Sequence, residues 1–210
     1  MAESDTKSAE ASIVMGPDRA EIVFGLGGNQ GDVRAAFRVA IRGLESELGT
    51  ARVAGLYRSA PISAIAQADF LNTAVAFDWP TTRLDEPADT EARRWVGLAK
   101  RLERAAGRDH DPGSAGPRDA PRPLDIDLLL LGEHRVDLPA LHEDGDVGAF
   151  DPWPGAIRVP HARILERRFV LRPLLDLLGD RALPIGDGTV TPSAALEQLG
   201  EEQRVEPISW

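Results

Sequence analysis

Two aspartates interrupt an apolar segment in the second half of the chain, where the sequence RPLDIDLLLLG covers residues 122–132. Asp125 and Asp127 are two residues apart, and residues i and i+2 of a β-strand point to the same face of the sheet. The spacing therefore predicts two carboxylates side by side, about 7 Å apart, at the start of a buried strand. Like charges this close repel each other, so a partner is needed that makes the arrangement favourable.

Magnesium is the partner that these residue types favour. Mg²⁺ prefers one or two carboxylates together with phosphate oxygens and water, so two such ions would relieve the repulsion and bind a polyphosphate. Arg122, three residues before Asp125, could contact the same phosphates through its planar guanidinium. The alternative is an Asp-x-Asp pair that is simply solvated at a sheet edge, and the apolar residues around it disfavour that interpretation.

A glycine-rich segment, GLGGNQGD at residues 25–32, is a second candidate for phosphate binding. It lacks the lysine of a P-loop, and its glycines are spaced one residue too far apart for the dinucleotide fingerprint, so a tight strand-to-helix turn explains it equally well. Asn29 and Asn72 are the only asparagines of the chain. We expect Asn29 to be a left-handed turn residue, whereas the amide of Asn72 offers a donor and an acceptor to the edge of a heterocycle.

The composition excludes several classes of function. The chain has 210 residues, no cysteine and a formal net charge of -10. Without cysteine it has no thiol nucleophile, redox pair or iron–sulfur site, and the acidic balance argues against a general nucleic-acid binder. Arginines gather at residues 101–122 and 158–172, which allows a local anion site on an acidic protein. No segment approaches the ~20 apolar residues of a membrane span, so we expect a cytoplasmic protein.

The elements that must position these residues follow from hydrophobic periodicity. After a leader at residues 1–20 that is expected to be disordered, the pattern predicts one domain over residues 21–210. Strands are expected at 21–26, 51–60, 70–79 and within 122–132, and helices at 33–48 and 90–106. This β-α-β-β-α-β order is typical of the α+β class and of a ferredoxin-like sandwich, with an antiparallel sheet and both helices on one side. C-terminal extensions follow: a short hairpin at 132–139, a polar loop at 140–157, a largely helical or mixed stretch at 160–180 and a helix at 192–200.

Four segments together resemble one protein family. RDAPRPLDIDLL (118–129) is similar to the signature of the 6-hydroxymethyl-7,8-dihydropterin pyrophosphokinases of folate biosynthesis. GLGGNQGD (25–32), LYRSAPISAIAQADFLNTAV (56–75) and VPHARILERRFVLRPL (159–174) resemble other segments of that family in the same order. The resemblance runs from about residue 21 to about residue 180, and it implies a ferredoxin-like fold as well as a reaction.

The implied reaction is transfer of pyrophosphate from ATP to the hydroxymethyl group of the pterin, with release of AMP. The resemblance implies that Asp125 and Asp127 hold two Mg²⁺ ions on the triphosphate, and that Arg108, Arg122 and Asp127 are catalytic. The residues expected around ATP lie in the matched segments and on the second helix: Lys100, Glu103, Arg108, Arg118, Arg122, His161 and Arg167. Catalysis of this kind depends mainly on positioning and electrostatics.

The resemblance also implies a slot for the flat pterin ring. Phe70 and Phe169 would stack on its two faces, and Asn72 with nearby backbone groups would bind its polar edge. The residues expected to line this slot are Gly27, Ser59, Ala60, Ile62, Phe70, Asn72 and Phe169. The expected partners are these two small substrates, with no nucleic acid and no membrane, and the family context allows a folate-pathway enzyme as a protein partner.

Some positions depart from the family pattern. Gly28 replaces a usual serine, Lys100 a frequent glutamine, Asp119 a tryptophan of some members, and Ala162 an aromatic residue of some members. The changes leave two alternatives open: a divergent Mg²⁺-dependent transferase, and a non-catalytic ferredoxin-like ligand-binding module. Segment 108–121 is polar and glycine-rich, and we expect it to act as a lid over both substrates.

Overall fold

The computed structural model describes residues 19–62, 65–80, 86–108, 120–140, 155–185 and 188–210. Residues 1–18 of the expected leader, Arg118 and Asp119, most of the expected lid and most of the loop at 140–157 lie outside the described residues. None of the described helices is both long and apolar enough to cross a lipid bilayer.

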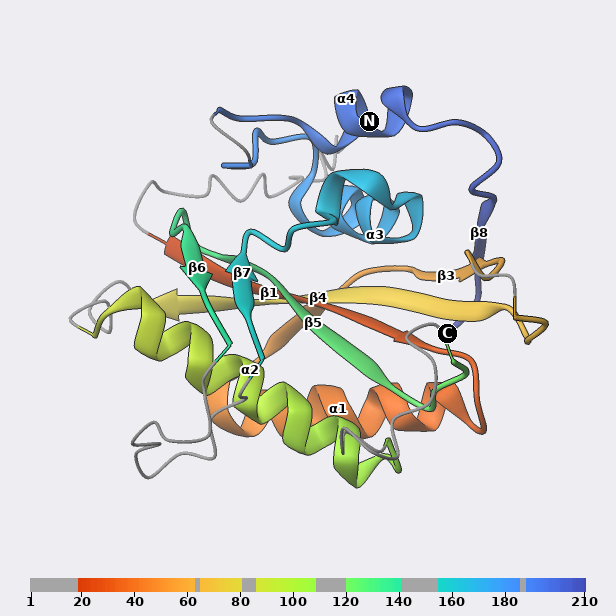
Figure 1. Cartoon of the computed structure of the whole chain (residues 1–210), viewed down its shortest axis with the longest axis horizontal. Coiled ribbons are helices and arrows are strands. Elements are labelled where there is room, and N and C mark those ends of the chain that lie inside the picture. The colour runs from red at the N-terminus through yellow and green to blue at the C-terminus, as the bar shows by residue number, and fades with distance from the viewer. Residues whose placement is uncertain (1–18, 63–64, 81–85, 109–119, 141–154, 186–187) are drawn as a thin grey trace, which may run out of the picture.

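A six-stranded antiparallel sheet forms the centre of the molecule (Figure 1). Its strand order is β5-β1-β4-β3-β8, with β2 beside β4. The strands are β1 (Arg19–Gly28), β2 (Ala51–Val53), β3 (Leu56–Ser59), β4 (Phe70–Pro80), β5 (Asp125–Leu131) and β8 (Val205–Ile208). If β2 and β3 are counted as two halves of one strand, the order of strands and helices up to β5 confirms the predicted ferredoxin-like βαββαβ arrangement.

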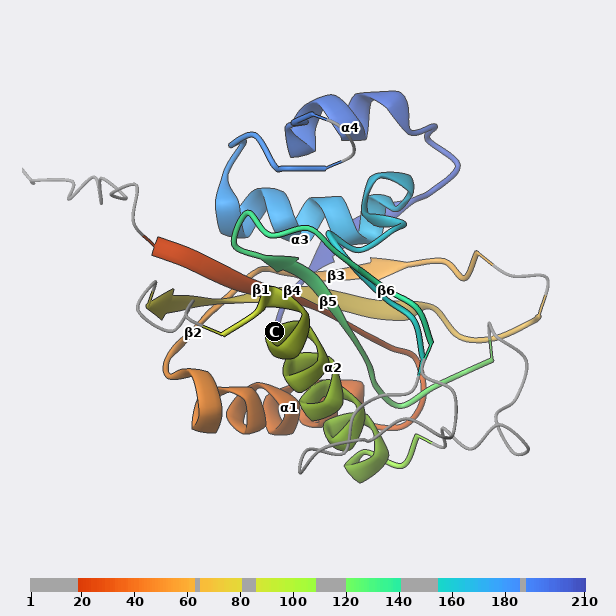
Figure 2. The same ribbon diagram turned by 60° about the vertical axis from the view of Figure 1, so that its left-hand side comes forward.

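Helices cover both faces of this sheet, as Figures 1 and 2 show from two directions. The predicted pair, α1 (Val33–Leu48) and α2 (Ala88–Ala105), packs on one face. The opposite face carries α3 (Arg168–Leu178), with α4 (Pro192–Gln198) packed against α3. The start of α1 is set by Asp32, whose Oδ1 accepts a hydrogen bond from the Ala35 N–H at 3.0 Å, and the helix ends at Gly49 with φ 85°.

The alternation of side chains along β1 explains where the sheet is filled and where it is open. Ile22, Phe24 and Leu26 belong to the core under α1 and α2, whereas Val23 packs on the α3 side. By the same alternation Gly25 and Gly27 also face the α3 side, where they present no side chain. The sheet is therefore covered around Val23 and left open around the two glycines.

Two predicted elements differ in the structure. The strand expected at 51–60 is divided, because the Gly55 N–H donates to Asp176 Oδ2 of α3 at 3.1 Å instead of continuing the ladder. The hairpin expected at 132–139 is wrong: β6 (Val136–Leu138) pairs with β7 (Ile157–Val159), a strand much further along the chain. The stretch at 160–180, which was expected to be largely helical or mixed, contains a 3-10 turn (Ile164–Glu166) followed by α3.

Strand β8 was not predicted from the sequence. It has no clear alternation, and it contains Pro207, which cannot donate to a ladder. An edge strand tolerates proline, and β8 lies at the edge of the sheet, paired only with β3 among the described strands.

Candidate active site

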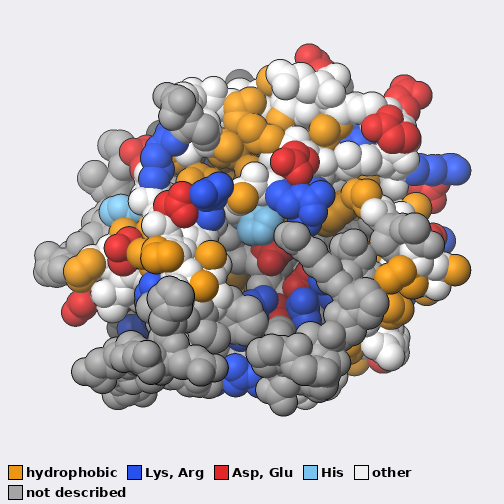
Figure 3. All heavy atoms as spheres, viewed as in Figure 1, with side chains coloured by type: hydrophobic (Ala, Val, Ile, Leu, Met, Phe, Trp, Pro, Cys, Tyr) orange, Lys and Arg blue, Asp and Glu red, His pale blue; other side chains and the backbone are white. Residues whose placement is uncertain are grey.

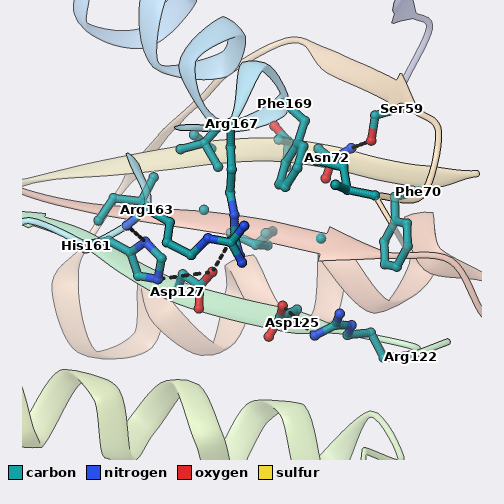
Figure 4. A pocket seen from close by; sticks show the side chains of 18 of the residues that line it. Ser59, Phe70, Asn72, Arg122, Asp125, Asp127, His161, Arg163, Arg167 and Phe169 are labelled. Atoms are coloured by element: carbon teal, nitrogen blue, oxygen red, sulfur yellow. Dashed lines mark hydrogen bonds and ion pairs between the residues drawn. The ribbon is translucent and has the colours of Figure 1, made fainter. Parts of the chain in front are cut away.

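A cavity of about 380 Å³ opens over the uncovered part of the sheet. Figure 3 shows acidic, basic and histidine side chains gathered around a hollow on this face, and Figure 4 shows the same side chains from close by. The cavity is bounded by β1, β4 and β5 below, the end of β3 and the following loop on one side, and the segment leading into α3 above. A cavity of this volume lies within the range that small-molecule ligands occupy.

The two aspartates lie on one face of β5, as predicted. Asp125 is paired with Gly27 of β1 and Asp127 with Gly25, and both aspartates line the cavity (Figure 4). A side chain on Gly25 would press against Leu129, with a Cβ only 3.2 Å from Leu129 Cδ1. The glycines opposite the aspartates therefore leave the space beside the carboxylates open to a ligand.

Asp125 is held by two arginines. One of its carboxylate oxygens, Oδ1, forms a short ion pair with Arg108, and the other, Oδ2, lies 3.1 Å from Arg122 Nη1. Burial raises the pKa of Asp125, but the charges of Arg108, Lys100 and Arg122 outweigh it and hold the pKa at about 2. Asp125 is thus a stable carboxylate at neutral pH whose charge is already balanced within the protein.

Glu103 lies under the cavity and does not line it. Its side chain is fully buried, and its Oε1 accepts hydrogen bonds from the Ile126 N–H at 2.6 Å and from Lys100 Nζ at 2.7 Å. Arg108 Nη1 lies 3.2 Å from the other oxygen. Burial raises the pKa of Glu103 to about 7, although Lys100 and Arg108 lower it. Glu103 thus supports β5 between the two aspartates, and its contact with ATP stays a prediction.

Asp127 has looser partners than Asp125. Its Oδ2 lies 3.9 Å from His161 Nε2 and 3.8 Å from Arg167 Nη1 (Figure 4). His161 Nδ1 accepts a hydrogen bond from the Arg163 N–H at 3.3 Å, which leaves Nε2 to carry the proton of the neutral ring. Burial lowers the pKa of His161, with Asp127 acting in the opposite direction, so the imidazole is neutral at pH 7. The Asp127 carboxylate is the more available of the two for an added ligand.

The other half of the cavity is apolar and amide-lined. Phe70 begins β4, Phe169 lies in the first turn of α3, and Asn72 stands between them (Figure 4). Asn72 is buried, and its Nδ2 donates to Ser59 Oγ at 3.0 Å, which fixes the orientation of the amide. Arginines of the charged half lie on both rings.

These two contacts join the halves of the cavity. The Arg122 guanidinium carbon is 5.6 Å from the centre of the Phe70 ring, and that of Arg167 is 5.5 Å from the centre of the Phe169 ring. Cation–π contacts at this distance hold each arginine near the boundary between the polar and the aromatic parts.

Asn29 corrects one expectation. No described residue other than glycine has a positive φ, so Asn29 is not a left-handed turn residue. Its side chain instead joins three segments: Oδ1 accepts from the Arg122 N–H at 2.9 Å, and Nδ2 donates to Gln67 Oε1 at 2.8 Å and to the Ala68 carbonyl at 2.9 Å. Asn29 thereby fixes the backbone of Arg122 relative to the loop before Phe70.

The structure brings most of the predicted residues into one cavity. Those that line it are Gly27, Ser59, Ala60, Ile62, Phe70, Asn72, Lys100, Arg108, Arg122, Asp125, Asp127, His161, Arg167 and Phe169. Glu103 is beneath it, and Arg118 lies outside the described residues. Sequence reasoning missed Gln67 and Arg163, which also line the cavity. Arg163 could have been found, because it lies in the arginine-rich stretch at 158–172 that indicated an anion site, whereas no sequence pattern indicated Gln67.

Two departures from the family pattern have a structural account. A Cβ on Gly28 would lie 2.6 Å from the Pro123 carbonyl oxygen, so the serine usual at this position does not fit here without a shift of the backbone. Lys100 lines the cavity and pairs with Glu103. Ala162 is exposed.

Comparisons with known proteins identify the family of the chain. The family model for 7,8-dihydro-6-hydroxymethylpterin-pyrophosphokinase (HPPK) matches residues 23–179. A curated 2-amino-4-hydroxy-6-hydroxymethyldihydropteridine pyrophosphokinase from Pseudomonas aeruginosa is 31% identical over 167 residues, covering 79% of this chain and 85% of that protein. The mitochondrial folate synthesis bifunctional protein of Pisum sativum is 35% identical over 160 residues, covering 76% of this chain and 25% of that protein.

The chain spans about a quarter of the length of such plant relatives. Among solved structures, wild-type HPPK-DHPS from Plasmodium falciparum superposes with a TM-score of 0.59 at 12% identity, covering 86% of this chain and 44% of that one, which supports the fold alone. Because the family model matches residues 23–179, which is most of the chain, this chain belongs to the 7,8-dihydro-6-hydroxymethylpterin-pyrophosphokinase family.

Proposed function

We propose that this protein transfers pyrophosphate from ATP to the hydroxymethyl group of 6-hydroxymethyl-7,8-dihydropterin and releases AMP, as a step of folate biosynthesis. One observation carries the proposal: a single cavity joins a charged half to an aromatic half. Lys100, Arg108, Arg122, Arg163 and Arg167 face two carboxylates there, so the described charged side chains sum to an excess of positive charge. That excess suits a triphosphate, although the whole chain carries a net charge of -10.

The arginines are suited to the charge that moves during the transfer. Arg108 and Arg122 already lie on one side of Asp125, and Arg167 lies on the side of Asp127. Guanidinium groups bind phosphate oxygens in a planar, bidentate manner and cannot lose their charge at neutral pH. The neutral His161, with a proton on Nε2, can donate a hydrogen bond to a phosphate oxygen.

The donor set fits magnesium. Among the described residues, no group of three or more histidine, aspartate and glutamate side chains is gathered around a common point, so a metal here needs oxygens from its substrate. Mg²⁺ is bound in this way, through one or two carboxylates plus phosphate oxygens. Asp127 would hold it through Oδ2, whose nearest charged partner among the described residues is 3.8 Å away. Asp125 would join by giving up part of its contact with Arg122. When bound, the ion would neutralise phosphate charge.

The aromatic half is suited to a flat heterocycle. Phe70 and Phe169 would stack on the ring, and the fixed amide of Asn72 would bind its polar edge together with backbone groups of Ser59, Ala60 and Ile62. The nucleophilic hydroxymethyl oxygen would then point to the charged half, because the two halves meet at Arg122 and Arg167. Holding both reactants in one geometry supplies much of the rate enhancement in phosphoryl chemistry.

Product analysis tests the proposal. The protein is incubated with ATP and Mg²⁺, with and without 6-hydroxymethyl-7,8-dihydropterin, and nucleotides and pterins are separated by chromatography. We expect AMP and a pyrophosphorylated pterin in equal amounts, and only when the pterin is present. ADP as the product contradicts pyrophosphate transfer. Binding of both ligands without turnover supports a non-catalytic module, and turnover only with another heterocyclic alcohol supports a divergent transferase.

The number of magnesium ions and a folate-pathway protein partner remain proposals. The first follows from the two carboxylates on β5, and titration with Mg²⁺ in the presence of an inert ATP analogue measures the stoichiometry. The second has its support in relatives whose names describe bifunctional folate synthesis proteins, of which this chain spans a fraction.

A further inference from the structure

The C-terminal segment, defined here as residues 199–208, contacts two different walls of the cavity. The family match ends at residue 179, so this segment lies beyond the matched region. Its strand β8 runs beside β3, with Val205 paired to Ser59, whose hydroxyl holds Asn72 (Figure 1). Just before that strand, Gln203 contacts the start of α3. One short stretch of chain therefore connects the wall that carries Asn72 with the wall that carries Phe169.

Gln203 makes two hydrogen bonds that bracket Arg167. Its Oε1 accepts from the Arg168 N–H at 3.0 Å, and its Nε2 donates to the Glu166 carbonyl at 2.9 Å. The first N–H groups of a helix have no partner within the helix, and Arg167, the residue at the cap position of α3, provides no side-chain cap. The amide of Gln203 supplies from a distance the capping that the local sequence lacks.

The segment is itself held to the same helix. Arg168 Nη1 donates to the Leu199 carbonyl at 2.9 Å and to the Leu196 carbonyl at 3.3 Å, at the end of α4. A cation at the C-terminal end of a helix is favourable, because the last carbonyls there lack helical partners. Arg168 and Gln203 thus form reciprocal contacts between α3 and the C-terminal segment, and Arg168 stands between Arg167 and Phe169, which line the cavity.

We propose that Gln203 is a positioning residue for ligand binding: by fixing the backbone on both sides of Arg167, it holds the Arg167 and Phe169 side chains over the cavity. The inference rests on the proposed function, because it assigns to Arg167 the phosphate and to Phe169 the pterin. Arg167 has an extended backbone between a 3-10 turn and α3, so its direction is set by the residues on either side of it. Without the amide of Gln203, this junction loses both of its hydrogen bonds to the segment that leads into β8.

The test compares substitutions at one position. Gln203→Met keeps the length of the side chain and removes both hydrogen bonds, Gln203→Ala also removes its bulk, and Gln203→Glu keeps an acceptor for the Arg168 N–H. Gln198→Ala is the matched control, because Gln198 is an exposed glutamine at the end of α4. Affinities for 6-hydroxymethyl-7,8-dihydropterin and for Mg²⁺ with α,β-methylene ATP are measured by calorimetry on the full chain, well below every melting temperature.

We expect Gln203→Met and Gln203→Ala to weaken both ligands by roughly fivefold, the equivalent of one net hydrogen bond. Gln203→Glu should recover most of the pterin affinity, since its carboxylate still caps α3, and Gln198→Ala should bind as the wild type does. A role in stability alone would lower the melting temperature and leave these affinities unchanged.

Two results overturn the inference. One is a wild type and a Gln203→Met variant with equal affinities for both ligands, and the other is a Gln203→Glu variant as weak as Gln203→Met. A wild type that binds neither ligand overturns the proposed function itself, and the positioning role with it. The wild-type measurement therefore separates the two failures.

Discussion

The two aspartates of β5 share a face and differ in their surroundings. From spacing alone, mutual repulsion was the expected problem. In the structure Arg108 and Arg122 balance Asp125, whereas Asp127 lies 3.8 Å or more from its charged partners. The two carboxylates are therefore not equivalent: Asp125 pairs closely with two arginines, whereas Asp127 has only longer ion pairs among the described residues. Removing Asp125 would leave two arginines without their partner rather than relieve a repulsion.

Asp127→Asn separates ligand binding from folding. The amide keeps the size of the side chain and removes the charge that would hold a metal, while its distant partners lose little. We expect pterin-dependent AMP release to fall by about 100-fold or more, in line with the loss of a metal-binding or charge-stabilising group. The melting temperature should stay close to that of the wild type. Turnover with ordinary Mg²⁺ dependence in this variant would refute the assignment.

Asp125 makes the stability of the protein depend on acid. Its pKa in the folded protein, about 2, lies below the ordinary 3.8, so the stabilisation it gives is complete above pH 3.8 and is lost as the pH falls through 2. The shift corresponds to roughly 2 kcal/mol in the free energy of unfolding. Denaturant unfolding of the wild type and of Asp125→Asn should differ by about this amount at pH 5, and the gap should close towards pH 2. A gap that is constant with pH would contradict the ion pairs described here.

At the scale of residues, the sequence predicted which side chains belong to the site better than it predicted the contacts of each side chain. Asp125, Asp127 and Arg122 come from one segment, so strand geometry alone places them together. The contact of Asn29 with Arg122 was not predicted, because the two residues are 93 positions apart and no local pattern indicates such a contact. The burial of Glu103 beneath the cavity also could not be predicted, because helix periodicity does not tell a buried carboxylate from one at the rim of a cavity.

At the scale of elements, the turn from β1 to α1 fits tightly against the segment that enters β5. The Asn29 N–H donates to the Arg122 carbonyl at 2.9 Å, and the place of a Cβ on Gly28 is taken by the Pro123 carbonyl. The turn thus sets the position of Arg122 from its backbone side, and Asn29 does so through its amide. The glycine-rich segment positions an arginine rather than providing a P-loop.

Gly28→Ser tests this packing by restoring the serine usual in the family. The new Cβ would lie 2.6 Å from a backbone oxygen, so Pro123 must move and Arg122 with it. We expect a loss of roughly 1–3 kcal/mol in the free energy of unfolding, typical of overpacking, together with a lower kcat/KM. Gly188→Ser is the control, because nothing lies within 4 Å of a Cβ there. If Gly28→Ser matches this control in both measurements, the turn is looser than described.

Long, periodic elements were predicted well and short ones poorly. Helices α1 and α2 and strands β1 and β4 follow from hydrophobic periodicity within two residues at their ends. The division of the second strand depends on Asp176 of α3, and the pairing of β6 with β7 joins segments separated by a long loop. Strand β8 has four residues and a proline, and it exists because β3 offers it an edge. In each case a distant part of the chain decides the local structure.

At the scale of the whole molecule, the α3 side of the sheet carries two charged clusters with different roles. One is the cavity over Gly25 and Gly27. The other, nearer the start of β1, is a buried Glu21 that forms ion pairs with Arg52 and Arg181. Arg52 Nη1 also donates to the Leu177 carbonyl at 3.0 Å, so this cluster joins β1 and β2 to the end of α3 and the segment after it. The polar groups of the first cluster are open to a ligand, whereas those of the second cluster form ion pairs with one another.

Glu21→Gln should therefore change stability and spare the ligands. The substitution keeps the shape of a side chain that is only 2% exposed and removes the charge shared by two arginines. Because those arginines are 41% and 44% exposed, water can solvate them, so we expect a loss of roughly 1–3 kcal/mol, below the range for a fully buried pair. Glu47→Gln is the control: its partner Arg94 lies 3.8 Å away, both side chains are at least a third exposed, and such pairs contribute little.

Denaturant unfolding and pterin affinity are measured on both variants. An unfolding free energy equal to that of Glu47→Gln would contradict the structural role of Glu21. A loss of pterin affinity, measured well below the melting temperature, would mean that the two clusters are coupled through β1. The substitution at Glu21 would then change ligand binding at the other end of the same strand.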